Sequence, residues 1–162
     1  MLAPKYLLAC VLLCASAACS SDPAAPTPGD EQDLTGAPTT LPTASLTPGV
    51  VGSVTDLRTL CTPNFSSTVR NVTSAEKAQV AAAYHFTGAN STVEYDHLIS
   101  LEIGGSNDPK NLWPQPIAEA HVKDRLENLL HREVCAGKMQ LPDVQQRIAA
   151  DWIKLWNDVG KP

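Results

Sequence analysis

Apolar positions repeat with a helical period in three stretches of the chain beyond residue 70. A first helix is predicted to begin at Thr73, because Thr73 and Glu76 form a capping box, and to run through residue 84 toward Gly88. A second is expected from about Ile117 to Gly137, and a third from Pro142, a residue suited to a first helical turn. The predicted apolar faces of the last two helices are formed by Val122, Leu126 and Leu129, and by Val144, Ile148, Trp152 and Leu155.

The segment between the first two helices is predicted to form a β-hairpin. Residues 93–103 alternate loosely between apolar and polar side chains, and the pattern breaks at two glycines, residues 104–105. Residues 111–113 would form a short return strand, which Pro114 and Pro116 are expected to stop. A small hairpin with a helix after it and further helices on its flanks indicates an α+β domain.

The start of the chain has the features of an export signal. Lys5 precedes an apolar run at residues 6–15, which is too short to span a bilayer, and small residues at 16–18 lead to Cys19. This order predicts a signal peptide at residues 1–18 that ends in a lipobox, with Cys19 as the acylated first residue of the mature chain. The lipid would anchor the exported protein to a membrane surface in the cell envelope. The alternative is an ordinary signal peptide cut near Ala18, which would give a secreted protein.

Composition divides the mature chain into two parts. Residues 19–50 are rich in Pro, Thr, Ala, Ser and Gly and have almost no large apolar side chains, so they are expected to form a disordered tether. The folded domain is predicted to span residues 51–162. From residue 51 onward, eleven Lys and Arg stand against thirteen Asp and Glu, a balance near −2. This is not the basic composition usual in proteins that bind DNA without sequence preference.

Two cysteines remain in the predicted domain, Cys61 and Cys135. An even number in an oxidising compartment leads us to expect a disulfide between them, worth roughly 4 kcal/mol for a loop of this length. The competing interpretation is one half of a zinc site. It has less support, because neither cysteine has a neighbour at the spacing expected of metal ligands.

The predicted hairpin carries an arrangement of polar residues that suggests chemistry. Asp96 and His97 lie on its first arm, two glycines follow at the turn, Asn111 comes fourteen residues after His97, and a helix follows. Over residues 93–125 this arrangement resembles the HNH nucleases, which have the ββα-metal fold. Segments on both flanks resemble a group of exported bacterial HNH-like proteins, among them Cys61-Thr62-Pro63, Asn111-Leu112-Trp113-Pro114, Val134-Cys135 and Asp151-Trp152.

The resemblance implies a role for each of the first three residues. Asp96 would be a metal ligand, and His97 would be the general base that deprotonates water at neutral pH. Asn111 would hold the hairpin and orient His97. Neighbouring residues of a strand point to opposite faces, so the hairpin must twist or bulge for Asp96 and His97 to serve one site.

The resemblance further implies that His121, on the following helix, completes the metal site. Asp124 or Asn128 could take that place instead. Lys123 and Arg125 are candidates for binding phosphate oxygens, although charges on an exposed helix commonly serve solvation alone. One divalent ion is expected, Mg²⁺ or Mn²⁺, with Zn²⁺ and Ni²⁺ as alternatives.

The function implied by the resemblance is a metal-dependent endonuclease that hydrolyses phosphodiester bonds, with DNA rather than RNA as the expected partner. The alternative is a non-catalytic surface lipoprotein, a binding module that keeps the HNH scaffold without turnover. A metallopeptidase is disfavoured, because the chain contains no His-Glu-x-x-His motif. The sequence names no protein partner.

Overall fold

The computed structural model describes residues 40–162. The predicted signal peptide, the lipidated Cys19 and the tether up to residue 39 lie outside the described residues. Within residues 40–162, no helix has both the length and the apolar character needed to cross a membrane.

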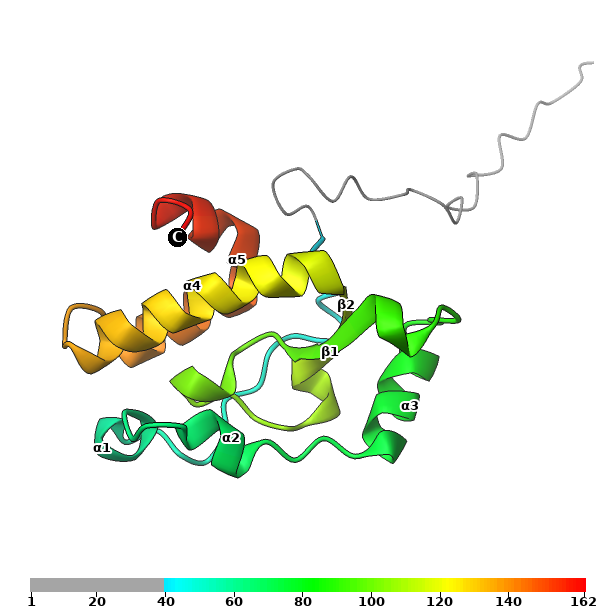
Figure 1. Cartoon of the computed structure of the whole chain (residues 1–162), viewed down its shortest axis with the longest axis horizontal. Helices are drawn as coiled ribbons and strands as arrows, with labels where there is room; N and C mark the ends of the chain where they lie inside the picture. Colours follow the sequence, from blue (N-terminus) through cyan, green and yellow to red (C-terminus); the bar gives the residue numbers. More distant parts are fainter. Residues whose placement is uncertain (1–39) are drawn as a thin grey trace, which may run out of the picture. The chain divides into compact units, whose positions relative to one another are not determined.

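The described chain is an α+β domain, as predicted. Two short helices, α1 (Leu57–Leu60) and α2 (Phe65–Val69), precede α3 (Ser74–Ala83). A hairpin of β1 (Val93–His97) and β2 (Leu112–Pro116) is followed by the long helices α4 (Ile117–Cys135) and α5 (Leu141–Asp158). Short 3-10 turns are η1 (Asn90–Thr92), η2 (Leu101–Ile103) and η3 (Pro109–Asn111). Figure 1 shows α4 running past the hairpin; α4 contacts both strands and α5, and α3 packs against β2.

The helix predicted from the capping box is α3. The Thr73 hydroxyl accepts a hydrogen bond from the backbone N–H of Glu76, and the Glu76 carboxylate accepts one from the backbone N–H of Thr73. The helix ends at Ala83, and His85 adopts a left-handed backbone conformation (φ 51°) just after it. A local sequence signal therefore determines where this helix begins.

The hairpin differs from the prediction in both arms. β1 ends at His97 rather than near residue 103, and β2 continues through Pro114 and Pro116, which were expected to stop it. The two prolines pair with Tyr95 and Val93 in the antiparallel register. A strand tolerates proline where the missing N–H faces an edge without a partner, and in a two-stranded sheet each strand has such an edge. Pro114 and Pro116 are two residues apart on β2, so their backbone nitrogens point toward the same edge of the strand.

The loop that joins β1 to β2 is held closed by Asn111, whose side chain is fully buried (0 % exposed). Its Oδ1 accepts from the backbone N–H of Ile99 at 3.0 Å and of Val50 at 3.2 Å. Its Nδ2 donates to the carbonyls of Ile99 at 2.9 Å and Ser106 at 2.8 Å. Gly105 is needed here, because a Cβ at this position would lie 1.8 Å from the carbonyl oxygen of Ile99. The loop is therefore a fixed element and not a flexible turn.

The main apolar core lies between α4, α5 and this loop. The predicted buried face of α5 is confirmed, since all four of its residues are buried. On α4 the buried stripe is rotated from the prediction: Leu126 is buried, whereas Val122 and Leu129 are half-buried. Leu130 and Val134 take their place in the core. The rotation brings Lys123 onto the buried face, which shapes the site described below.

Residues 40–50 were assigned to the tether, but they pack against the domain. Thr47 is 1 % exposed, and its hydroxyl donates to the carbonyl of Leu112 at 2.8 Å and lies 2.7 Å from the Tyr84 hydroxyl. The indole N–H of Trp152 donates to the carbonyl of Thr40 at 3.1 Å. This segment contributes hydrogen bonds more than apolar burial, so its hydropathy pattern did not indicate that it is folded.

The predicted pairing of the two domain cysteines is confirmed. Cys61, at the C-terminal end of α1, is disulfide-bonded to Cys135, the last residue of α4, at a sequence separation of 74. Closing a loop of that length stabilises the fold by roughly 4 kcal/mol in the chain-entropy model.

Candidate active site

A cavity of about 270 Å³ lies at the end of β1 and contains both Asp96 and His97. Because His97 is the last residue of β1, the chain leaves the strand pairing there and the two neighbours can line one cavity. The other lining residues come from α2, η2, α4 and nearby segments: Ser66, Ser67, Arg70, Glu94, Ser100, Leu101, Glu102, Asp124 and Glu127.

The imidazole of His97 is held by an asparagine of the hairpin loop. His97 is 2 % exposed, and its Nε2 lies 3.1 Å from Oδ1 of Asn107. Nδ2 of Asn107 donates to the carbonyl of Val69 at 2.8 Å, and Oδ1 also accepts from the backbone N–H of Asn71 at 3.1 Å. These two bonds orient the amide, so Oδ1 faces the imidazole and Nε2 carries the proton. Nδ1 is then the nitrogen that can accept a proton.

Burial also determines the charge of this histidine. Desolvation lowers the pKa of His97 from 6.5 to about 4, although the hydrogen bond that His97 donates to Asn107 and the charge of Asp96 act in the opposite direction. The imidazole is therefore neutral at physiological pH. A neutral imidazole with one nitrogen fixed as a donor has the form required of a general base.

The residue that orients His97 is Asn107 and not Asn111, to which this role was assigned. The side chain of Asn111 is instead bound to the backbone of the loop. In the sequence, Asn107 follows two glycines and a serine, a composition typical of a turn, and it was not among the predicted site residues. Its position ten residues after His97 was the one available signal.

Lys123 is not free to bind phosphate, contrary to the prediction. Its side chain is 1 % exposed, and Nζ donates to Oδ2 of Asp96 at 2.6 Å, to the carbonyl of His97 at 2.7 Å and to the Glu127 carboxylate. An ammonium group has three N–H donors, and these partners use all of them. Burial alone would lower the pKa of Lys123, but the charges of Asp96 and Glu127 raise it above its ordinary value.

Negative charge exceeds positive charge around the cavity. Five carboxylates line it, those of Glu94, Asp96, Glu102, Asp124 and Glu127, whereas Arg70 is the basic residue among the described lining residues. Burial raises the pKa of Glu127 to about 7, with the charges of Asp96 and Asp124 adding to the effect and Lys123 opposing it. Burial and the charges of Glu94 and Asp96 likewise raise the pKa of Asp124. The cavity therefore favours cations.

Two of the predicted site residues lie outside the lining of this cavity. His121 and Arg125 are exposed on α4, and neither is among the described residues that line it. Asp124, which was weighed as an alternative to His121, does line it. Arg70, at the end of α2, lines the cavity and pairs with Glu94 at 3.0 Å.

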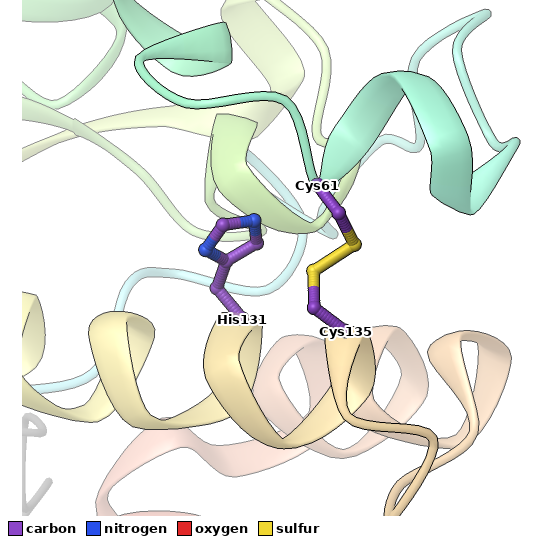
Figure 2. A group of neighbouring side chains, drawn as sticks. All are labelled: Cys61, His131 and Cys135. Atoms are coloured by element: carbon purple, nitrogen blue, oxygen red, sulfur yellow. A yellow bond between two sulfur atoms is a disulfide. The ribbon is translucent and has the colours of Figure 1, made fainter.

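A group of residues that could hold a metal ion does exist in the described chain, but at a different place. Among residues 40–162, ligand atoms from three His, Cys, Asp or Glu residues come within 4.8 Å of one another only at Cys61, His131 and Cys135, where Figure 2 shows His131 beside the disulfide. Both sulfurs are used by the disulfide in this state. Among the described residues that line the cavity at Asp96, no three such ligand atoms come within 4.8 Å of one another.

Comparisons of the chain with protein-family models, with curated proteins and with solved structures found no match.

Proposed function

We propose that the domain hydrolyses phosphodiester bonds of nucleic acid, DNA rather than RNA, with His97 as the general base. The observation that carries the proposal is the state of His97: a neutral, buried imidazole, oriented by Asn107, in a cavity lined by carboxylates. Hydrolysis of a phosphodiester requires a base for the attacking water and positive charge for the phosphate oxygens. His97 would supply the first of these in the cavity.

The general base acts through Nδ1 of His97. Asn107 holds the proton on Nε2 and prevents the ring from turning, so Nδ1 can take a proton from a water molecule in the cavity. Lys123 acts as a positioning residue in this arrangement. It binds the side chain of Asp96 and the backbone carbonyl of His97 together, which fixes the two neighbours relative to each other.

The positive charge would come from a divalent cation. A phosphodiester is an anion, and the carboxylates of the cavity outnumber its cations. Asp96 and Glu127 share the ammonium of Lys123 and Glu94 pairs with Arg70, but Glu102 and Asp124 have no ion pair among the described residues, so a cation would have to accompany the phosphate into the cavity. Oε2 of Glu102 is buried and has no hydrogen-bond partner among the described residues, so one carboxylate oxygen of the cavity lacks compensation. Mg²⁺ commonly binds through one or two carboxylates together with substrate phosphates and water, and not in a complete protein cage.

Asp96 and Asp124 are the residues that would hold this ion, and Glu102 lines the same cavity. A bound cation supplies neutralisation of the charge on the phosphate oxygens. The oxygen-only set suits Mg²⁺ or Mn²⁺. Zn²⁺ and Ni²⁺ prefer sites with more nitrogen or sulfur ligands, and His97 is the one imidazole among the described residues that line the cavity.

The proposal is tested by incubating the purified protein with supercoiled plasmid. Nicking is expected with Mg²⁺ or Mn²⁺ and is expected to stop when a chelator is added. A structured RNA of similar length, tested in parallel, measures the preference between the two nucleic acids. Absence of cleavage with any of these ions would overturn the proposal.

A second function, a non-catalytic binding module, is favoured by one observation. The carboxylate of Asp96 is already paired with the buried ammonium of Lys123, so part of the predicted metal site has a permanent counter-ion. Binding of Mn²⁺ without cleavage of any nucleic acid would identify this module.

Whether the domain is a nuclease or a binding module, we propose that the protein is exported and anchored to a membrane surface through a lipid on Cys19. The location rests on the sequence of residues 1–19 alone. Fractionation of cells that produce the protein would separate the two interpretations of this segment. A membrane-bound product that a Cys19→Ala substitution releases supports the lipid anchor, and a soluble product supports ordinary secretion.

A further inference from the structure

The disulfide has a histidine beside it. His131 and Cys135 lie one turn apart on α4, and Cys61 comes from the end of α1. Figure 2 shows the three side chains converging from these two elements, and one ligand atom from each lies within 4.8 Å of the others. Two sulfurs and an imidazole are a ligand set typical of zinc sites.

The spacing along α4 supports a site of this kind. Residues four apart project from one face of a helix, which is how the two histidines of a His-Glu-x-x-His motif reach one ion. The half zinc site was discounted in the sequence because neither cysteine was thought to have a neighbour at the spacing of metal ligands, and that premise was wrong for Cys135. The neighbour of Cys135 at the required spacing is a histidine.

The two elements are also joined by contacts that do not depend on the disulfide. Nε2 of His131 lies 3.0 Å from the carbonyl oxygen of Leu60, the residue just before Cys61. The Leu60 side chain is buried in the main core together with Leu126, Leu130 and Val134 of α4. These contacts keep Cys61 close to α4 after the bond between the sulfurs is broken.

Reagents can reach this place. Cys135 is exposed, and Cys61 and His131 are half-buried. A cavity of about 250 Å³ adjoins His131, and its polar lining includes Thr62, Asn64 and Ser66. This cavity gives water access to His131, and water is the usual fourth ligand of a zinc ion with three protein ligands.

We propose that reduction of the Cys61–Cys135 disulfide converts this cross-link into a zinc site, with Cys61, His131 and Cys135 as ligands and water in the fourth position. A dithiol reductant supplies two electrons and two protons to the disulfide and is itself oxidised to a disulfide. Zinc then displaces the protons of the two thiols and binds the thiolates. The ion holds the same two segments that the disulfide holds in the oxidised protein. This inference is independent of the hydrolytic function proposed above.

The test uses Co²⁺ as a spectroscopic substitute for Zn²⁺. A phosphine reduces the disulfide to two thiols and becomes its oxide, with oxygen taken from water, and is then removed without air. Addition of Co²⁺ to the reduced protein is expected to give one bound equivalent with thiolate-to-cobalt charge-transfer absorption, which Zn²⁺ abolishes by displacement. The oxidised protein is expected to show no such absorption.

Two histidine variants identify the third ligand. His131→Ala keeps both cysteines and is expected to weaken Co²⁺ binding by roughly tenfold or more. Loss of a residue that only hydrogen-bonds to a metal ligand already lowers metal affinity by about tenfold, and loss of a ligand itself should cost at least as much. His85→Asn removes an exposed histidine in the left-handed region, where asparagine is tolerated, and is expected to bind as the wild type does.

Three results would overturn the inference: no thiolate absorption in the reduced protein, equal affinity in His131→Ala, or equal absorption in the oxidised protein. Circular dichroism shows whether the reduced chain stays folded. If it unfolds, restoration of the helical signal by Zn²⁺ supports the site, and failure of Zn²⁺ to restore it rejects the site.

Discussion

Replacement of His97 by glutamine removes an imidazole that folding holds in its neutral form. Burial lowers the pKa of His97 from 6.5 to about 4. Above pH 6.5 the imidazole is neutral in both the folded and the unfolded chain. Between pH 6.5 and about 4 the unfolded chain takes up a proton that the folded chain does not, so the wild type loses stability as the pH falls. The loss amounts to roughly 3 kcal/mol across this window.

Glu127 must be separated from this effect, because it titrates in the opposite sense. Its pKa is raised to about 7 in the folded chain, so its contribution to stability grows as the pH falls below that value. Wild type and His97→Gln both contain Glu127. The difference between their free energies of unfolding therefore isolates the histidine.

The measurement is urea-induced unfolding of the oxidised protein at several pH values between about 7 and 4. The wild type is expected to lose roughly 3 kcal/mol relative to His97→Gln as the pH falls through this range. A difference that stays constant would show that His97 is not a buried neutral base. The argument for its catalytic role would then fail.

Three further substitutions test other parts of the structure by the same measurement at neutral pH. Lys123→Met leaves two buried carboxylates without their ammonium and is expected to cost roughly 3–5 kcal/mol, whereas the exposed Arg125→Met should change stability by about 0.5 kcal/mol at most; equal effects would mean that Lys123 is solvated. Asn111→Ala removes four hydrogen bonds from the hairpin loop and is expected to cost roughly 3 kcal/mol or more; a loss below about 1 kcal/mol would contradict its place in the loop. Thr47→Val keeps the side-chain shape but loses both hydroxyl contacts, and it is expected to lower the free energy of unfolding by about 1–2 kcal/mol. An unchanged free energy of unfolding would show that residues 40–50 do not stabilise the domain.

Features with a local cause were predictable from the sequence. The capping box gave the start of α3, and the spacing of Val144, Ile148 and Trp152 gave the buried face of α5. The even cysteine count gave the disulfide. The packing of residues 40–50 was missed, because it depends on hydrogen bonds to distant segments of the chain. The length of β2 was missed, because prolines are tolerated there only at the outer edge of a two-stranded sheet, which the sequence does not reveal.

The candidate site was predictable only in part. Asp96 and His97 do share a cavity, but the partners of both residues come from other elements. Lys123 stands among charged neighbours in the sequence, so its burial could not be inferred without knowing that Asp96 and Glu127 would meet its ammonium. Asn107 and Asn111 belong to one loop, and only its folded path decides which of them reaches His97.

The most direct test of the proposed chemistry compares initial rates of plasmid nicking in Mn²⁺ for the wild type, His97→Ala and His121→Ala. The first substitution removes the base from the cavity and is expected to lower the rate by roughly 10²–10⁴-fold. The second removes an exposed histidine that lies outside the described cavity lining, and its rate should stay within a few-fold of the wild type. Equal rates for His97→Ala and the wild type would contradict the general base, and loss of cleavage in His121→Ala would restore that residue as a metal ligand.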